Sequence, residues 1–92
     1  MHANVNFITV DDDRLGEALD ALTERVIPDL RQRPGFVSGC WLAPVEGTGM
    51  TITLWTDERA AKEAAENLSE QGALPPGVTI TRQESRAVVA VV

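Results

Sequence analysis

The order in which strand-like and helix-like hydrophobic patterns follow one another is the feature that most constrains this chain of 92 residues. Segments rich in β-branched and aromatic residues indicate strands at 4–10, 36–45, 50–56 and 78–92. Helical spacing of apolar residues separates the first strand from the second and the third from the fourth. The order β-α-β-β-α-β is that of the split βαβ, ferredoxin-like fold. We therefore predict one α+β domain over residues 1–92, with an antiparallel sheet that carries two helices on one face.

The first predicted helix has a single apolar stripe. Its residues recur at helical spacing and are Leu15, Leu19, Leu22, Val26 and Leu30. Any aspartate of residues 11–13 is a candidate N-cap, because a carboxylate accepts hydrogen bonds from free backbone N–H groups. Pro28 lacks an N–H group, so we expect a kink or a broken last turn near it. Pro34 and Gly35 are typical of the end of such a helix.

The third strand alternates strictly and leads directly into the second helix. Ile52 and Leu54 are predicted on one face, and Thr51, Thr53 and Trp55 on the other. Asp57 is the predicted N-cap of a helix that stops at Gly72. The apolar face of that helix is thin and consists of Ala61, Ala64, Ala65 and Leu68.

Irregular positions are predicted in and between the strands. Gly39 indicates a bulge or a close approach within the second strand. Residues 46–49 indicate a hairpin turn. The last segment reads either as one long strand or as a strand pair, with a possible bend at the polar residues 82–85.

Two helices can cover only one face of the predicted sheet. Because no third layer is left in the chain, the other face would expose a broad apolar patch. The apolar segment "AVVAVV" at 87–92 adds to this surface. Burial of several valines would contribute several kcal/mol at roughly 25 cal/mol per Å². We therefore expect a homodimer formed through the open sheet face and the C-terminal strand.

Composition excludes several classes of partner. Eight lysines and arginines stand against 14 aspartates and glutamates, a net charge of −6, which disfavours nucleic acids and anionic membranes. The single cysteine, Cys40, cannot form an intrachain disulfide, and we interpret it as a small buried side chain. No cysteine and histidine cluster has metal-ligand spacing. The absence of a secretory signal and of a long apolar run predicts a cytoplasmic protein.

Two segments resemble a known family. "RPGFVSGCWLAP" at 33–44 and "TLWTDERAAKEA" at 53–64 are similar to the antibiotic biosynthesis monooxygenase type of dimeric α+β barrel proteins. The resemblance implies a homodimer with facing sheets and, in each subunit, a ligand cavity between sheet and helices. Members of that family include cofactor-free monooxygenases acting on polycyclic phenols, haem-degrading oxygenases and many proteins with no assigned reaction.

The resemblance also implies two candidate catalytic residues. Relatives that oxidise haem or anthrone-like phenols use an asparagine in strand one and a tryptophan in strand three, which Asn6 and Trp55 match. An asparagine is unusual in a strand, and its amide N–H groups could hold a substrate carbonyl or an oxyanion. Trp55 could wall a cavity and donate one hydrogen bond. The alternatives are that Trp55 is a packing residue and that Asn6 is solvated or bonded to backbone.

Some residues used by those relatives are missing here. The haem-degrading relatives take an iron ligand from a histidine of helix two, but the only histidine of this chain is His2. The chain also has no tyrosine, which some phenol-oxidising relatives place near the substrate.

The sequence therefore supports three functional hypotheses. The first is a cofactor-independent monooxygenase-like enzyme that acts on a flat aromatic or quinone-like substrate and needs no cofactor or metal. The second is a non-catalytic homodimer that binds a small apolar or aromatic ligand or acts as a scaffold. The third is a haem-binding relative that lacks the usual histidine. An open cavity that Asn6 and Trp55 face would count against the scaffold hypothesis.

Overall fold

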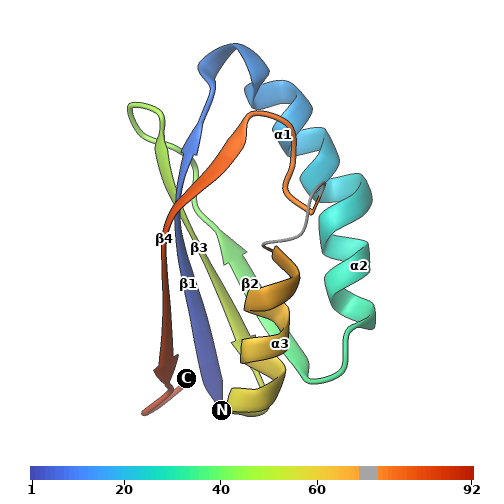
Figure 1. Cartoon of the computed structure of the whole chain (residues 1–92), viewed down its shortest axis with the longest axis vertical. Helices are drawn as coiled ribbons and strands as arrows, with labels where there is room; N and C mark the ends of the chain where they lie inside the picture. Colours follow the sequence, from blue (N-terminus) through green and yellow to red (C-terminus); the bar gives the residue numbers. More distant parts are fainter. Residues whose placement is uncertain (69–72) are drawn as a thin grey trace.

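The computed structural model, which describes residues 1–68 and 73–92, is a sheet with helices on one face (Figure 1). The antiparallel strands are β1 (His2–Val10), β2 (Phe36–Trp41), β3 (Thr48–Trp55) and β4 (Val78–Ala87), in the spatial order β2-β3-β1-β4. The α-helices are α1 (Leu15–Ala21), α2 (Ile27–Gln32) and α3 (Glu58–Leu68). The predicted α+β, ferredoxin-like fold class is confirmed.

The first helical layer is a continuous run whose winding changes. It begins with a 3-10 turn, Asp12–Arg14, and a π-helical turn, Leu22–Val26, separates α1 from α2. Asp11 occupies the N-cap position but makes no side-chain cap bond, so the predicted aspartate cap is wrong. Pro28 lies in the first turn of α2, and the helix continues to Gln32. The predicted break therefore takes the form of a wide π-helical turn before the proline. Because Pro28 lies in the first turn of α2, its missing N–H group costs no intrahelical hydrogen bond.

The hairpin and the cap of α3 follow the sequence closely. The backbone N–H of Ala60 donates to Asp57 Oδ1 at 2.8 Å, so the predicted N-cap is confirmed. The hairpin turn is shorter than residues 46–49. Within this segment only Glu46 and Gly47 take positive φ values, of 52° and 77°, as the two central residues of a two-residue turn require. The predicted stop at Gly72 lies outside the described residues.

The second strand is shorter than predicted and ends at Trp41. The predicted close approach at Gly39 is confirmed, since a Cβ atom there would lie 2.5 Å from Cη2 of Trp41. A register shift between Phe36 and Ser38 interrupts the pairing with β3. Gly39 therefore leaves room for the Trp41 ring to lie against the strand.

The last segment forms one strand with an irregularity just before the predicted bend. Phe7 pairs with Arg82 whereas Ile8 pairs with Ile80, so Thr81 is the extra residue. Its hydroxyl donates to the Phe7 carbonyl at 3.1 Å. The polar residues 82–85 continue the strand, which ends at Ala87, and residues 88–92 lie outside it. The prediction that the strand reaches residue 92 is therefore wrong.

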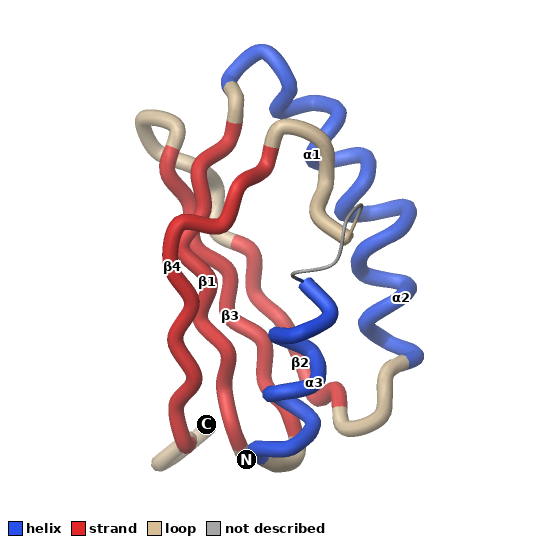
Figure 2. Tube along the Cα trace, in the orientation of Figure 1, coloured by secondary structure: helices blue, strands red, loops and turns tan. Residues whose placement is uncertain are grey.

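The helices cover one face of the sheet, and no described helix lies on the other (Figure 2). Ile52 and Leu54 face this open side, because their neighbours along β3 face the helices. On the same side, the Arg82 guanidinium lies 4.3 Å from the centre of the Phe7 ring. Cys40 is exposed, so the prediction of a buried thiol is wrong, because β2 is the edge strand of the sheet. Within the described ranges, no helix is both long and apolar enough to cross a bilayer.

Candidate functional site

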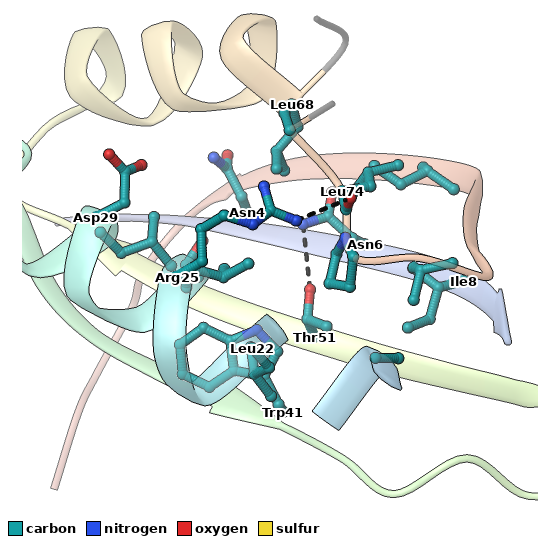
Figure 3. Close-up of a pocket in the computed structure, with 18 of the residues that line it drawn as sticks. Asn4, Asn6, Ile8, Leu22, Arg25, Asp29, Trp41, Thr51, Leu68 and Leu74 are labelled. Atoms are coloured by element: carbon teal, nitrogen blue, oxygen red, sulfur yellow. Dashed lines mark hydrogen bonds between the residues drawn. The ribbon is translucent and has the colours of Figure 1, made fainter. Parts of the chain in front are cut away.

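A cavity of about 680 Å³ lies between the sheet and the helical layer. The sheet supplies its floor, and the first helical layer and the segment that leads into β4 supply its walls (Figure 3). This volume is within the roughly 300–1,000 Å³ of typical small-molecule sites. The cavity predicted from the family resemblance is therefore present in a single chain.

The apolar stripe of the first helix lines this cavity. All of its predicted members face it, namely Leu15, Leu19, Leu22, Val26 and Leu30. None of them is fully buried, and Leu19 keeps 51% of its surface exposed. The stripe therefore provides the wall of a binding site more than the packing of a core.

Trp55 combines the two roles that the sequence left open. It lines the cavity, yet only 1% of its surface is exposed, and it packs with Ala61 and Ala64 in the hydrophobic core. Its ring meets Phe36 edge-on, with centroids 5.4 Å apart. The indole N–H donates to Thr53 Oγ1 at 2.9 Å, so it already has a hydrogen-bond acceptor within the protein.

Asn6 lies on the floor of the cavity with 4% of its surface exposed. Its Nδ2 donates to Thr51 Oγ1 at 3.2 Å (Figure 3), and its Oδ1 accepts from Gln83 Nε2 at 3.1 Å. Asn6 is therefore held from both neighbouring strands by side chains. Neither alternative foreseen for it, a solvated amide or a bond to backbone, describes it.

The two candidate residues line the same cavity without touching. Asn6 pairs with Thr51, and Trp55 lies four residues further along β3, on the order of 13 Å away at the usual strand rise. A ligand that reaches both residues must therefore be extended.

Asn4 is a further polar residue of the floor. It is 3% exposed, and its Nδ2 donates to the backbone carbonyl of Ala61 at 2.8 Å, which ties β1 to α3. Its Oδ1 is buried and has no hydrogen-bond partner among the described residues. An unpaired buried acceptor costs about 1–3 kcal/mol, so the Asn4 oxygen is an unsatisfied polar atom in the floor of the site.

Among the described residues, the charged side chains that line the cavity all come from the first helical segment and its end. Arg25, Asp29 and Arg33 belong to this wall. Arg33 and Asp29 form an ion pair at 3.0 Å, and Arg25 donates to the Leu74 carbonyl at 3.3 Å. The floor is therefore polar but uncharged, and the charges lie on the opposite wall.

The lining does not fit a haem held by a protein ligand to iron. The described residues that line the cavity include no histidine, cysteine, methionine or tyrosine, and His2 is not among them. No group of three or more histidine, cysteine, aspartate or glutamate side chains is placed to hold a metal within the described ranges. We therefore derive no chemistry through an iron centre.

Sequence reasoning missed three polar residues of this site or beside it. Asn4 carries the same signal as Asn6, an asparagine within a strand, and the spacing of two puts both on one face. Thr51 was placed on the same face as Trp55, as the structure has it, but without a role. Gln83 gave no usable signal, since its position opposite Asn6 depends on the bulge at Thr81.

Known proteins resemble this chain in structure. No family model matches the sequence, and no curated protein matches it. MhuD, a heme-degrader from Mycobacterium tuberculosis solved with two hemes in its active site, is 22% identical with a TM-score of 0.76, over 100% of this chain and 99% of MhuD. SnoaB, a cofactor-independent oxygenase from Streptomyces nogalater, is 21% identical with a TM-score of 0.69, over 98% of this chain and 94% of SnoaB.

A third similar structure is a monooxygenase from the gene ActVA-Orf6 of Streptomyces coelicolor, in complex with Nanaomycin D. It is 20% identical with a TM-score of 0.60, over 99% of this chain and 90% of that one. At these identities the likeness concerns the fold. The chain therefore has the α+β, ferredoxin-like fold that the resemblance to antibiotic biosynthesis monooxygenases predicts, and shares it with two oxygenases and a heme-degrader.

Proposed function

We propose that this protein is a small-molecule enzyme of the monooxygenase type, acting on a flat aromatic or quinone-like substrate without a cofactor. The observation that carries the proposal is the cavity of about 680 Å³, with apolar helical walls above a polar, uncharged floor. Such a site encloses an aromatic ring system and orients one of its oxygen atoms. SnoaB and the ActVA-Orf6 protein, an oxygenase and a monooxygenase of the same fold, support the proposal.

The cavity residues bind and orient the substrate. The rings lie between the sheet floor and the leucines of the helical wall, with Trp41 at one side. Asn6 and Thr51 lie where a substrate carbonyl or phenolate oxygen meets the floor. Hydrogen-bond donors at that place stabilise negative charge on this oxygen when the substrate loses a proton.

The reaction that fits this arrangement oxidises an activated CH₂ group beside an aromatic ketone. The carbon loses a proton to water, and the resulting carbanion, delocalised onto the bound oxygen, reduces dioxygen. One oxygen atom becomes the new carbonyl and the other leaves as water, so that R₂CH₂ and O₂ give R₂C=O and H₂O. The carbon loses four electrons and dioxygen accepts four.

Oxygen uptake with anthrone as the probe tests this function. We expect uptake above the buffer rate together with formation of anthraquinone. Loss of an oxyanion donor typically lowers the rate about 10²- to 10³-fold, so Asn6→Ala should approach the buffer rate. Trp55→Phe should also lower the rate, and Lys62→Ala, on the exposed face of α3, should leave it unchanged. Uptake equal to buffer, or equal in wild type and Asn6→Ala, contradicts the proposal.

A second candidate is a ligand-binding homodimer without catalysis. Both candidate residues have partners within the protein, Trp55 through Thr53 and Asn6 through Thr51 and Gln83, and this arrangement suits binding as well as reaction. Binding of anthrone without oxygen uptake is the result that favours this candidate.

The bare sheet face supports assembly with a second copy of the chain. Its apolar residues, such as Ile52 and Leu54, have no helix of the described residues over them (Figure 1), and Val89 in the C-terminal tail is fully exposed. Sedimentation equilibrium should give a dimer at micromolar concentration, and Ile52→Lys should give a monomer. A monomeric wild type contradicts the assembly. We also predict a cytoplasmic location, where an exposed thiol such as Cys40 stays reduced.

A further inference from the structure

Three side chains from three neighbouring strands form a row across the sheet. Asn6 on β1 pairs with Thr51 on β3 and with Gln83 on β4. Cross-strand partners point to the same face of a sheet, and Asn6 and Thr51 both line the cavity. Gln83 is exposed and does not line the cavity. We call these three residues the polar row.

The hydrogen bonds of the polar row all run in one direction. Gln83 Nε2 donates to Asn6 Oδ1 at 3.1 Å, and Asn6 Nδ2 donates to Thr51 Oγ1 at 3.2 Å. A hydroxyl carries one proton and two lone pairs, and an amide nitrogen carries two protons. Because Thr51 accepts from Asn6, its own proton remains to be donated, and no residue of the described ranges accepts it. Thr51 thus keeps one proton and one lone pair free, and the row ends at the cavity in a proton that only a ligand acceptor can satisfy.

The same three residues could also form the row with every hydrogen bond reversed, and the cavity would then meet acceptors in place of a donor. The two ends of an amide have nearly the same size and shape but opposite hydrogen-bonding character. With the Asn6 amide turned over, Thr51 would donate to Asn6 Oδ1, and its free lone pairs would face the cavity. Asn6 is 4% exposed, so water cannot replace the partners that hold its amide. In this structure Gln83, the member of the row that reaches solvent, turns its Nε2 toward Asn6 Oδ1, and this donation gives the row its direction.

We propose that Gln83 is a positioning residue whose amide N–H holds the Asn6 oxygen and thereby makes the cavity select ligands that carry a hydrogen-bond acceptor. The favoured ligand presents a ring carbonyl or phenolate oxygen to Thr51 and Asn6. A ligand of the same shape that presents only an N–H or O–H donor is disfavoured. This inference rests on the proposed function, since it specifies which flat aromatic molecules the cavity takes.

Matched bicyclic probes test this selectivity. 1-Indanone presents only an acceptor, indole only a donor, and indane neither, and their sizes are nearly equal. A single neutral hydrogen bond contributes about 0.5–1.5 kcal/mol, which corresponds to about a two- to twelvefold change in Kd. We therefore expect the wild type to bind 1-indanone about two- to twelvefold more tightly than indole or indane, with Kd values measured by NMR titration.

Gln83→Glu is the decisive variant because it changes the direction and keeps the size. An exposed glutamate is ionised at neutral pH and can only accept, so Asn6 must turn its Nδ2 toward residue 83. The order of affinities should then invert, with indole bound more tightly than 1-indanone. Gln83→Met, which keeps the length but neither donates nor accepts strongly, should reduce the preference without inverting it. An unchanged preference for 1-indanone in Gln83→Glu overturns the inference.

A measurement without ligand separates this inference from the proposed function. In the free wild-type protein, the Asn6 side-chain NH₂ protons should give a nuclear Overhauser effect to the Thr51 methyl group. In Gln83→Glu this effect should move to the γ protons of residue 83. The reverse pattern in the wild type, or an identical pattern in both proteins, overturns the inference whether or not a probe binds. Equal affinities for all three probes overturn the selectivity while aromatic binding stands, and no binding of any probe counts against the proposed function itself.

Discussion

The helical segment α1–α2 and the helix α3 lie on the same face of one sheet but pack on it in different ways (Figure 2). Under α3, Ala61 and Ala64 are 0% and 8% exposed and pack on Trp55. Under α1 and α2, leucines line a cavity of about 680 Å³, and Leu19 is half exposed. Small residues allow a helix to pack closely on the sheet, whereas the leucines of α1 and α2 border the cavity. We call the region under α3 around Trp55 the packed end, and the region under α1 and α2 the hollow end.

The packed end should show the largest effect on stability. Trp55→Ala removes the most deeply buried large side chain, and such truncations typically cost about 3–5 kcal/mol. Leu22→Ala, at the hollow end, removes a half-buried side chain beside an existing cavity and should cost less than about 2 kcal/mol. Urea unfolding of both variants measures the difference. Equal losses would show that the two ends do not differ as described.

Added volume should separate the two ends in a second way. Ala61→Leu places a larger side chain against Trp55 in the closed core and should destabilise by about 1–3 kcal/mol. Ala18→Leu adds the same atoms on α1, where Ala18 lines the cavity, and should leave stability nearly unchanged while weakening ligand binding. Urea unfolding and the 1-indanone titration measure the two effects. A loss of stability in Ala18→Leu as large as in Ala61→Leu contradicts the comparison.

The sequence predicts which residues face inward but not whether they meet. The alternation in 50–56 correctly put Thr51, Thr53 and Trp55 on one shared face, which the structure shows to be the helix side, and the leucine spacing correctly defined one stripe. Periodicity cannot distinguish a core from a cavity wall, because both keep apolar groups from water. Alanines in one helix and leucines in the other were visible in the sequence, yet the larger residues border the open space.

The polar residues around the site also include some that the sequence could predict and some that it could not. Asn6 was predictable because asparagine is rare in strands. Its partner Gln83 was not, because the one-residue bulge at Thr81 sets which residues of β4 face the helices. Without the bulge, Arg82 or Glu84 would lie on that face instead. The register of a long-range strand pair is decided by the whole sheet and leaves no local signal.

The edge of the hollow end should respond to a single methyl group. In Gly39→Ala the new Cβ would lie 2.5 Å from the end of the Trp41 ring, so the ring must turn out of its present position. Because that ring lines the cavity, we expect altered ligand affinity with a stability cost of only about 0.5–1.5 kcal/mol, typical of a displaced rotamer. Trp41 fluorescence and urea unfolding report the two effects in a Trp55→Phe background. An emission maximum and a Kd identical to those of the parent would contradict this account.

The smallest effect is expected on the opposite face of the sheet, outside both ends. Hydrogen bonds from Arg86 and then Arg82 lower the pKa of Glu84 below its ordinary value of 4.5. The ionised carboxylate is thus favoured in the folded chain. Its contribution is fully present above pH 4.5 and is lost as the pH falls through the lowered pKa. The side chains are exposed enough that salt should weaken the effect.

Glu84→Gln isolates this contribution. The difference in urea midpoint between wild type and variant should be constant near neutral pH and shrink below about pH 4.5. Trp55→Ala and Leu22→Ala, which replace no ionisable side chain, should instead shift the midpoint by nearly the same amount at every pH. A difference for Glu84→Gln that grows on acidification would reverse the sign argued here. It would mean that the arginines do not hold the carboxylate in its ionised form, and that the open face is organised by something other than this charge cluster.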